Sequence, residues 1–390
     1  MNHPLRRGKM PNRVRPAIAP FCWAFMIFAA FVAAPAEGTL FDVVNLVTDD
    51  QAANSALITD PSLKNAWGIS HSATSPFWVS DNGAGVATLY SVDPVTNIPT
   101  KVGLVVSIPG DGSVTGQAFN GNSSAFNGDL FLFVNEDGTV SGWRGALGTT
   151  AEILVTGLST NVYKGTTDAV IGGNTYLYAA NFRTGAIDVF KGAAGAQDLT
   201  GNFTDPGLPS GYAPFDIQNI NGLLYVTYAL QDAAKRDDVP GSGHGFVSVF
   251  DTQGNFIERL ASGGSLNSPW GLAIAPSSFG AFAGDLLVGN FGDGTINAFD
   301  PLLGTPLGAL LGTDNKPLVI DGLWGLIAGN NGSGGSSQSI YFSAGPNGEA
   351  DGLFGVITAV PGTSVPEPAT LALIGVGLGG IAALRRRKLQ

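Results

Sequence analysis

The sequence has almost no cysteine or histidine: one cysteine, Cys22, and three histidines among 390 residues. Cys22 lies in an apolar N-terminal segment that we expect to be removed, so the mature chain would contain no disulfide, no thiolate nucleophile and no cysteine-bound metal. Its stability must then come from burial of apolar side chains and from backbone hydrogen bonds, which a large fold can supply.

Charged residues are also scarce, at 13% of the chain, and they are unevenly spread. Nine of the 19 basic residues lie near the two ends, so residues 37–364 hold ten basic and 29 acidic residues and have a formal charge of −19. A region this acidic repels nucleic acid and anionic lipid, and no nucleic-acid partner is predicted. The negative charge can keep the protein soluble, bind divalent cations or attract basic partners, and solubility is the simplest interpretation.

Signatures of helical bundles and of common catalytic sites are missing as well. The 56 glycines and 23 prolines argue against a helical bundle, and 44% hydrophobic residues argue against disorder. The chain has no G-x-S-x-G motif and no glycine-rich phosphate loop before a helix. His71 and His244 stand in no recognisable catalytic setting. The sequence therefore predicts an all-β protein rich in turns, without an assigned catalytic residue.

The first 36 residues have the three parts of a secretory signal peptide. Five basic residues between Arg6 and Arg15 precede an uncharged stretch over 16–36, which ends in Ala34-Pro35-Ala36. We expect cleavage after Ala36 by signal peptidase, and a retained membrane anchor is the alternative. The flanks of the arginine pair do not match a twin-arginine signal, which favours the general secretory route.

The last 26 residues combine a short motif, an apolar segment and a basic cluster. Val365-Pro366-Glu367-Pro368 comes first, sixteen uncharged residues follow over 369–384, and Arg385, Arg386, Arg387 and Lys388 end the pattern. Sixteen helical residues span about 24 Å, marginal for a hydrocarbon core of roughly 30 Å, and the basic cluster would stay cytoplasmic. This arrangement predicts a transmembrane helix that stops transfer.

These features together resemble the PEP-CTERM sorting signals of Gram-negative bacteria. The resemblance covers about 26 residues and rests on Pro366, Glu367 and Pro368, on the apolar segment, on Arg385, Arg386 and Arg387, and on the position at the C-terminus. It implies recognition by an exosortase, cleavage near the motif, and transfer to the cell surface or matrix of organisms that make exopolysaccharide. A plain tail anchor is the alternative.

Between the two ends, six similar segments recur at intervals of several tens of residues. Each has an inner β-rich run, a second run, a glycine-rich turn and a third run. The inner runs begin near Asn65, Thr115, Thr166, Ala213, Ser268 and Gly322. Turns such as Asp137-Gly138 and Asp293-Gly294 supply the positive φ angles that hairpins need. A fourth strand is expected in each linker.

Repeats of this length built from short strands predict a β-propeller of six blades over residues 37–362, with the sorting tail over 363–390. In pattern the segments resemble the six-bladed propellers of the NHL and lactonase-like type. Such a resemblance implies a central channel lined by the innermost strands.

Three tryptophans are candidate ligand-binding residues because they occupy inner runs. Trp67, Trp270 and Trp324 each precede a glycine, and Asp168 and Asp216 are expected at the comparable places in the third and fourth segments. The tryptophans could stack on carbohydrate. Packing between blades is the alternative, and large aromatic side chains do this well beside glycine.

Carboxylates and amides near the ends of β runs form a candidate metal site. Oxygen ligands suit Ca²⁺, the one cofactor that the pattern indicates. In lactonase-like propellers a calcium ion at the channel mouth polarises the substrate, and the resemblance implies a comparable set here, namely Asp81, Asp168, Asn181, Asp216 and Asn290. The alternative is that these Asn and Asp residues close hairpins.

The sequence thus predicts an exported propeller with a binding or structural role at the cell surface or in the extracellular matrix, held transiently in the inner membrane by its tail. Its expected partners are signal peptidase, an exosortase-type enzyme and exopolysaccharide. A calcium-dependent hydrolase or lactonase is the alternative function, and an adhesin whose aromatic residues hold sugar is a third.

Overall fold

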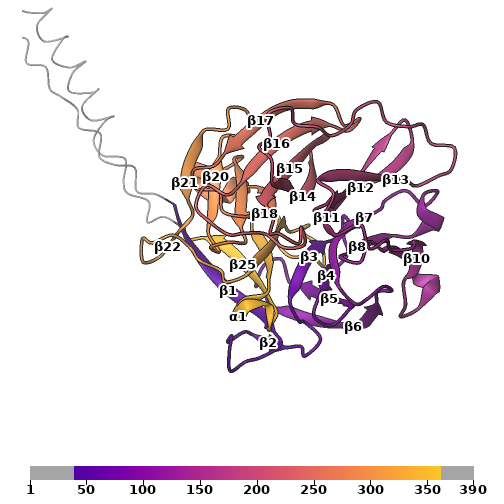
Figure 1. Ribbon diagram of the computed structural model, residues 1–390. Coiled ribbons are helices and arrows are strands. Elements are labelled where there is room, and N and C mark those ends of the chain that lie inside the picture. Colours follow the sequence, from indigo (N-terminus) through magenta and orange to yellow (C-terminus); the bar gives the residue numbers. More distant parts are fainter. Residues whose placement is uncertain (1–38, 362–390) are drawn as a thin grey trace, which may run out of the picture. The chain divides into compact units, whose positions relative to one another are not determined.

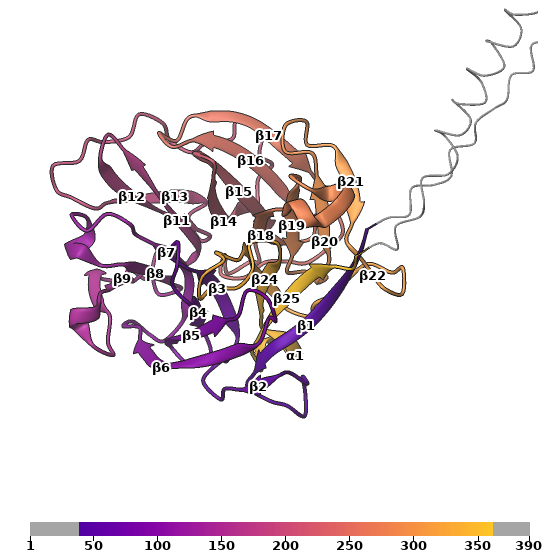
Figure 2. The same ribbon diagram turned by 180° about the vertical axis from the view of Figure 1, so that it is seen from behind.

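Six β-sheets arranged around a centre make up the part of the chain that the computed structural model describes, residues 39–361 (Figures 1 and 2). Each sheet is one blade, and in the first five blades the strands pair in chain order from the centre outward. The predicted six-bladed all-β propeller is therefore confirmed. The predicted signal peptide, the tail and both boundaries of the propeller lie outside the described residues.

Blades one to three follow one another along the chain. Blade one contains β3 (Ala66–Ser70), β4 (Phe77–Asp81), β5 (Val86–Val92) and β6 (Pro99–Ser107). Blade two contains β7 (Val114–Phe119), β8 (Phe131–Asn135), β9 (Val140–Trp143) and β10 (Glu152–Val155). Blade three contains β11 (Tyr163–Ile171), β12 (Asn174–Asn181) and β13 (Ala186–Lys191). The fourth strand expected in each linker does not form in blade three, where 192–211 has no assigned strand.

Blades four to six complete the ring. Blade four contains β14 (Tyr212–Ile220), β15 (Leu223–Leu230), β16 (Phe246–Asp251) and β17 (Phe256–Ser262). Blade five contains β18 (Pro269–Ile274), β19 (Leu286–Asn290), β20 (Ile296–Phe299) and β21 (Pro306–Ala309). Blade six contains β23 (Leu323–Ala328), β24 (Ile340–Ala344) and β25 (Leu353–Ala359). Four short helical turns lie in loops: η1 (Phe126–Gly128), η2 (Gly145–Leu147), η3 (Ser277–Phe282) and α1 (Pro346–Glu349).

The ring is closed by a strand from the other end of the chain. β1 (Leu40–Thr48) runs antiparallel to β25 and forms the outer strand of blade six, while the short β2 (Ile58–Thr59) and β22 (Leu311–Gly312) pair with β1. The indigo β1 lies beside the yellow β25 in both ribbon views (Figures 1 and 2). The Val360 amide donates to the Leu40 carbonyl oxygen at 2.8 Å, so the two ends of the propeller meet.

Adjacent inner strands contact each other at a level occupied by glycine. This level contains Gly68, Gly116, Gly165, Gly271 and Gly325, with Phe215 in blade four. A Cβ on Gly68 would lie 2.6 Å from the Thr115 carbonyl oxygen of blade two, and a Cβ on Gly116 would lie 2.6 Å from the Thr166 amide nitrogen of blade three. The inner strands can approach this closely only without side chains, so these glycines set the width of the channel.

The described residues include no helix long and apolar enough to cross a membrane. The predicted helix at 369–384 falls in the tail, beyond the described range.

Candidate functional site

Strand register shows which residues stand level around the channel. Ala66, Tyr163 and Pro269 each pair with the last residue of the second strand of their blade, and each inner strand then has a bulge. Trp67 is therefore level with Lys164 and Trp270. Asp168 lies four residues beyond Lys164, and Asp216 is level with Ile69, so the expectation that these aspartates occupy the tryptophan positions is wrong.

The three tryptophans come together at the end of the channel where the inner strands begin, which we call the channel mouth. The Trp67 and Trp324 rings stack at 3.6 Å between centroids, and Trp270 meets Trp324 edge-on at 5.6 Å. Phe291 stacks on Trp324 at 3.9 Å, and because it cannot share a face with Trp67, both faces of Trp324 are covered. The three indoles are at most 3% exposed, and sugar binding by them stays a prediction.

A buried lysine lies over the ring of Trp67 and forms ion pairs with two carboxylates. Lys164 is 1% exposed, and its Nζ lies 4.9 Å from the centroid of the Trp67 ring. Nζ donates to Glu136 at 2.5 Å and to Asp237 at 3.2 Å, and Arg236 donates to the second oxygen of Glu136 at 2.9 Å. A buried ammonium must be paired. Asp237, which pairs with Lys164, and Arg236, which pairs with Glu136, both belong to the insertion 231–244 of blade four.

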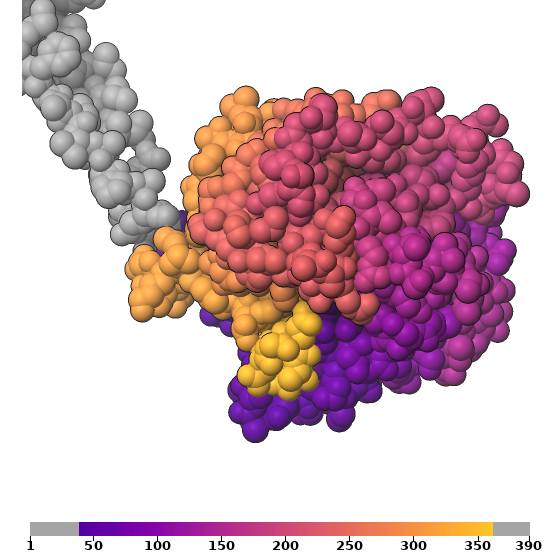
Figure 3. Space-filling model, in the orientation of Figure 1, coloured from indigo at the N-terminus to yellow at the C-terminus, as the bar shows by residue number. Residues whose placement is uncertain are grey.

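Glu349 reaches the mouth from the α1 segment of blade six. Asn347, Gly348 and Glu349 are all left-handed, with φ of 63°, 63° and 68°, a conformation that costs a residue with a side chain about 1 kcal/mol. The Asn65 amide donates to Glu349 at 3.4 Å. Burial raises the pKa of Glu349 to about 7, against the attraction of Lys164. In Figure 3 the yellow residues, which include α1, lie beside the indigo residues of the N-terminal segment.

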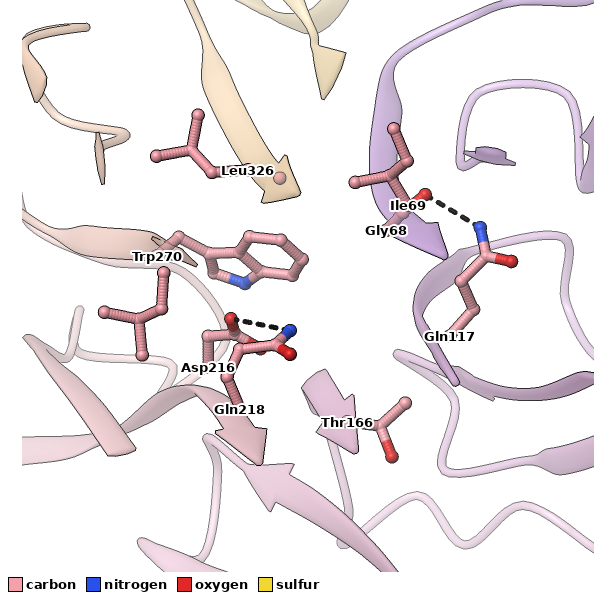
Figure 4. A pocket seen from close by; sticks show the side chains of 10 residues that line it. Gly68, Ile69, Gln117, Thr166, Asp216, Gln218, Trp270 and Leu326 are labelled. Atoms are coloured by element: carbon pink, nitrogen blue, oxygen red, sulfur yellow. Dashed lines mark hydrogen bonds between the residues drawn. The ribbon is translucent and has the colours of Figure 1, made fainter. Parts of the chain in front are cut away.

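Further along the channel lies a small cavity with one polar and one apolar side (Figure 4). Its volume is about 10 Å³, room for about one water molecule. Gln117, Thr166, Asp216 and Gln218 face it from blades two to four, and Ile69, Trp270, Leu272 and Leu326 complete it. Gln218 donates to Oδ2 of Asp216 at 3.5 Å, while the buried Oδ1 has no partner. Burial raises the pKa of Asp216 well above its ordinary value.

We expect Asp216→Asn to make the stability of the propeller less dependent on pH. A carboxyl whose folded pKa is raised contributes fully below its unfolded pKa, near 4, and that contribution is lost as pH rises through the folded pKa. The variant should therefore gain stability relative to wild type between pH 4 and pH 8, by about 1.4 kcal/mol for each unit by which the pKa is raised. Urea midpoints at both pH values measure this, and parallel pH curves would contradict it.

The five candidate calcium ligands do not meet at one point. Asp168 on β11 pairs with Leu177 on β12. Asn181 lies four residues beyond Leu177 on β12, which places it roughly 13 Å along the strand from that pair. Asp216 is the one member of the set that lines the cavity. Over residues 39–361, no group of three or more His, Cys, Asp or Glu side chains is arranged to hold a metal ion. The calcium set stays a prediction that the geometry does not favour.

Three of these residues close hairpins, as the alternative interpretation states. The carbonyl oxygens of Asp81, Asn181 and Asn290 accept from the amides of Gly85, Gly185 and Gly294, at 2.9 to 3.0 Å. The side-chain amide of Asn181 also donates to the Asp188 carboxylate, and the side-chain amide of Asn290 donates to the Ser265 carbonyl oxygen. Burial raises the pKa of Asp81 well above its ordinary value. The side chains of Asn181 and Asn290 are thus used in local hydrogen bonds, whereas both carboxylate oxygens of the buried Asp81 lack a hydrogen-bond partner.

Apart from the three tryptophans and Glu136, the residues that gather at the mouth are ones that the sequence did not single out. Lys164, Glu349 and the insertion residues Arg236 and Asp237 carry no motif. A signal was present for Glu136, because the residue that follows each second strand is level with the mouth. Asn82, Phe182 and Phe291 occupy the same place in other blades.

Comparison with known proteins gives a motif match and two long relatives. Residues 364–388 match the PEP-CTERM protein-sorting motif. Over 326 residues the chain is 35% identical to Uncharacterized protein R648 of Acanthamoeba polyphaga mimivirus, covering 78% of this chain and 77% of that protein. Uncharacterized protein L690 of the same virus is 34% identical over 320 residues, covering 76% and 80%.

Solved structures with a similar arrangement share little sequence with this chain. The soluble aldose sugar dehydrogenase from Escherichia coli is 10% identical, with a TM-score of 0.48, covering 82% of this chain and 100% of that one. An alpha-L-arabinanase of Penicillium chrysogenum is 12% identical, with a TM-score of 0.44, covering 76% and 98%. The six-bladed topology itself, rather than these likenesses, defines the fold.

Proposed function

The chain belongs to the family of the mimivirus proteins R648 and L690, and we propose that its propeller carries the function. The region shared with these relatives covers 78% and 76% of the chain, so it must include most of the propeller. We propose that the propeller is a non-enzymatic binding component of the cell surface or extracellular matrix. The sorting tail delivers it there, after signal peptidase and an exosortase-type enzyme have processed its two ends.

The sorting motif is the observation that carries this proposal. The match begins at residue 364, five residues after β25 ends at Ala359. This motif implies export and sorting to the cell envelope by an exosortase-type enzyme. The predicted cut after Ala36 falls four residues before β1. Processing at both ends would therefore leave little more than the propeller, which is why we assign the role at the surface to it.

The interior of the propeller supports binding over hydrolysis. The channel mouth is filled by stacked aromatic rings and by ion pairs, and the cavity beyond it holds about one water. A hydrolase needs a site in which a substrate carbonyl and an attacking water meet polarising groups. Within residues 39–361 no group of three or more His, Cys, Asp or Glu side chains is arranged to hold a metal ion, which disfavours the calcium-dependent alternative, while the surface loops offer contacts for a binding partner.

Replacing Pro366, Glu367 and Pro368 together by alanine is expected to prevent sorting without affecting the propeller. The change lies beyond the last strand and leaves the contacts within residues 39–361 as they are, whereas the processing enzyme loses its motif. In a host that encodes an exosortase, most of the protein should then remain uncut in the inner-membrane fraction. Cell fractionation and immunoblotting measure this distribution.

Thr363→Ala is the matched control, because Thr363 lies just outside the matched residues. It should be sorted like wild type. If the triple variant reached the surface in the same amount as this control, the proposed delivery would be wrong.

A further inference from the structure

Five buried polar atoms without hydrogen-bond partners lie at the channel mouth. The Nε1 groups of Trp67, Trp270 and Trp324 are buried and donate to no atom. The Asn65 Oδ1 and the Asn82 Nδ2 beside them also lack partners. Each orphaned buried group costs about 1–3 kcal/mol, so packing alone gives no reason to keep five of them in one place. A ligand that forms hydrogen bonds with these groups provides such a reason.

The mixture of donors and acceptors selects the chemistry of that ligand. Three indole N–H groups and an amide nitrogen require acceptors, while Asn65 Oδ1 and the carboxylate of Glu349 require donors. A hydroxyl group is both a donor and an acceptor, so a ligand with several hydroxyl groups can pair with all of these atoms. Charge narrows the ligand class further, because Glu349 is surrounded by the acidic side chains of Glu136, Asp237 and the insertion residue Asp238. These four acidic groups outnumber the cations of Lys164 and Arg236. An anionic ligand would be repelled, and a simple cation would leave the N–H groups unpaired.

The ligand can enter if two surface segments move aside. The insertion 231–244 is tied to the mouth through Arg236 and Asp237, whose side chains are 40% and 64% exposed. Displacing the insertion breaks the contacts of Arg236 and Asp237 but leaves the buried Lys164 paired with Glu136, so the ammonium keeps a partner. The α1 segment covers the other side, since a Cβ built on Gly345 would contact Asn65 Oδ1 and lie 3.4 Å from Trp324 Nε1.

We propose that the channel mouth is a capped binding site for a neutral, hydroxyl-rich ligand, such as one or two hexose units of a polysaccharide. The indole N–H groups, rather than the indole faces, hold it, because the rings stack on one another. This inference rests on the proposed function and gives it a ligand class. The insertion 231–244 and the α1 segment cover this site in the structure, and they move aside when the sugar binds.

The test is titration of the full-length protein in detergent with cellobiose, lactose and mannobiose, each neutral, and with digalacturonate as the charged comparison. Calorimetry gives the affinity, and tryptophan fluorescence reports the mouth. We expect at least one neutral disaccharide to bind and to change the fluorescence, and digalacturonate to bind more weakly. No binding by any of the three neutral sugars, or equal binding of digalacturonate, would overturn the proposal.

Trp270→Phe and Trp143→Phe form a matched pair for this test. Both remove an indole N–H, but Trp143 Nε1 donates to the Gly148 carbonyl oxygen at 2.8 Å on the outer part of blade two, while Trp270 Nε1 has no partner. Trp270→Phe should weaken sugar binding about fivefold, the equivalent of one hydrogen bond. Trp143→Phe should leave the affinity unchanged while lowering the urea midpoint.

Equal affinities for the two variants and wild type would assign Trp270 a packing role alone and overturn the proposal. Sorting to the surface is measured separately by fractionation. Sugar binding can therefore fail while the proposed delivery stands, and the two failures are distinguishable.

Discussion

Gly116→Ala is expected to destabilise the propeller by about 3–5 kcal/mol, or to prevent its closure. The new Cβ would lie 2.6 Å from the Thr166 nitrogen, 2.8 Å from the Gly165 carbonyl carbon and 2.9 Å from the Lys164 oxygen. All three are backbone atoms of blade three, so no side-chain rotation relieves the clash. The two inner strands must separate, which widens the ring that all six blades share. Chemical unfolding of wild type and variant measures the loss.

Gly103→Ala is the matched control for that experiment. Gly103 lies in the outer strand β6, and a Cβ placed there meets no atom within 4 Å. Alanine restricts the unfolded chain more than glycine does, so the control should be neutral or gain up to about 1 kcal/mol. If both variants unfolded at the same denaturant concentration, close approach of the inner strands would not set the width of the channel.

Closure of the ring by β1 is expected to supply a large part of the stability. Phe41 and Leu46 of this strand are at most 1% exposed and pack in two different hydrophobic clusters, on either side of blade six. Truncating each to alanine costs about 2–5 kcal/mol, and the losses should add because the clusters are separate. The double variant Phe41→Ala, Leu46→Ala should therefore lose most of the 5–15 kcal/mol typical of a folded protein.

Thermal and urea unfolding of the double variant measure this loss, and Asp42→Ala serves as its control. Asp42 is an exposed residue of the same strand, and its truncation should change the stability by less than about 0.5 kcal/mol. A double variant within about 2 kcal/mol of wild type would mean that burial of the β1 side chains contributes little to the stability of the propeller.

Number and type of blades could be predicted from the sequence because each blade is a local unit. Second and third strands are joined by short turns with glycine at fixed places, such as Gly138, Gly185 and Gly294, all left-handed. Period-two runs on either side fix the hairpin, and no distant contact is needed to recognise it. The sorting motif could be predicted for the same reason, since its features follow one another in order.

The expected alignment of two aspartates with the tryptophans was wrong for a different reason. Asp168 and Asp216 appeared equivalent to the tryptophans because they stand at similar distances into their runs. Each inner strand has a bulge, however, and a shift of one residue moves a side chain to the other face of a strand. Register between strands decided the positions, and the linear spacing did not reveal it.

The sequence by itself determined the all-β class, the six repeated hairpins, the acidic surface and the sorting motif, because each of these is a property of neighbouring residues or of composition. Tertiary structure alone decided the channel mouth. There Glu349 meets Asn65 across 284 positions, and Lys164 pairs with Asp237 across 73. Closure of the ring brings such pairs together, and nothing local in the chain specifies which residues of blades one, three, four and six will be level when β1 joins β25.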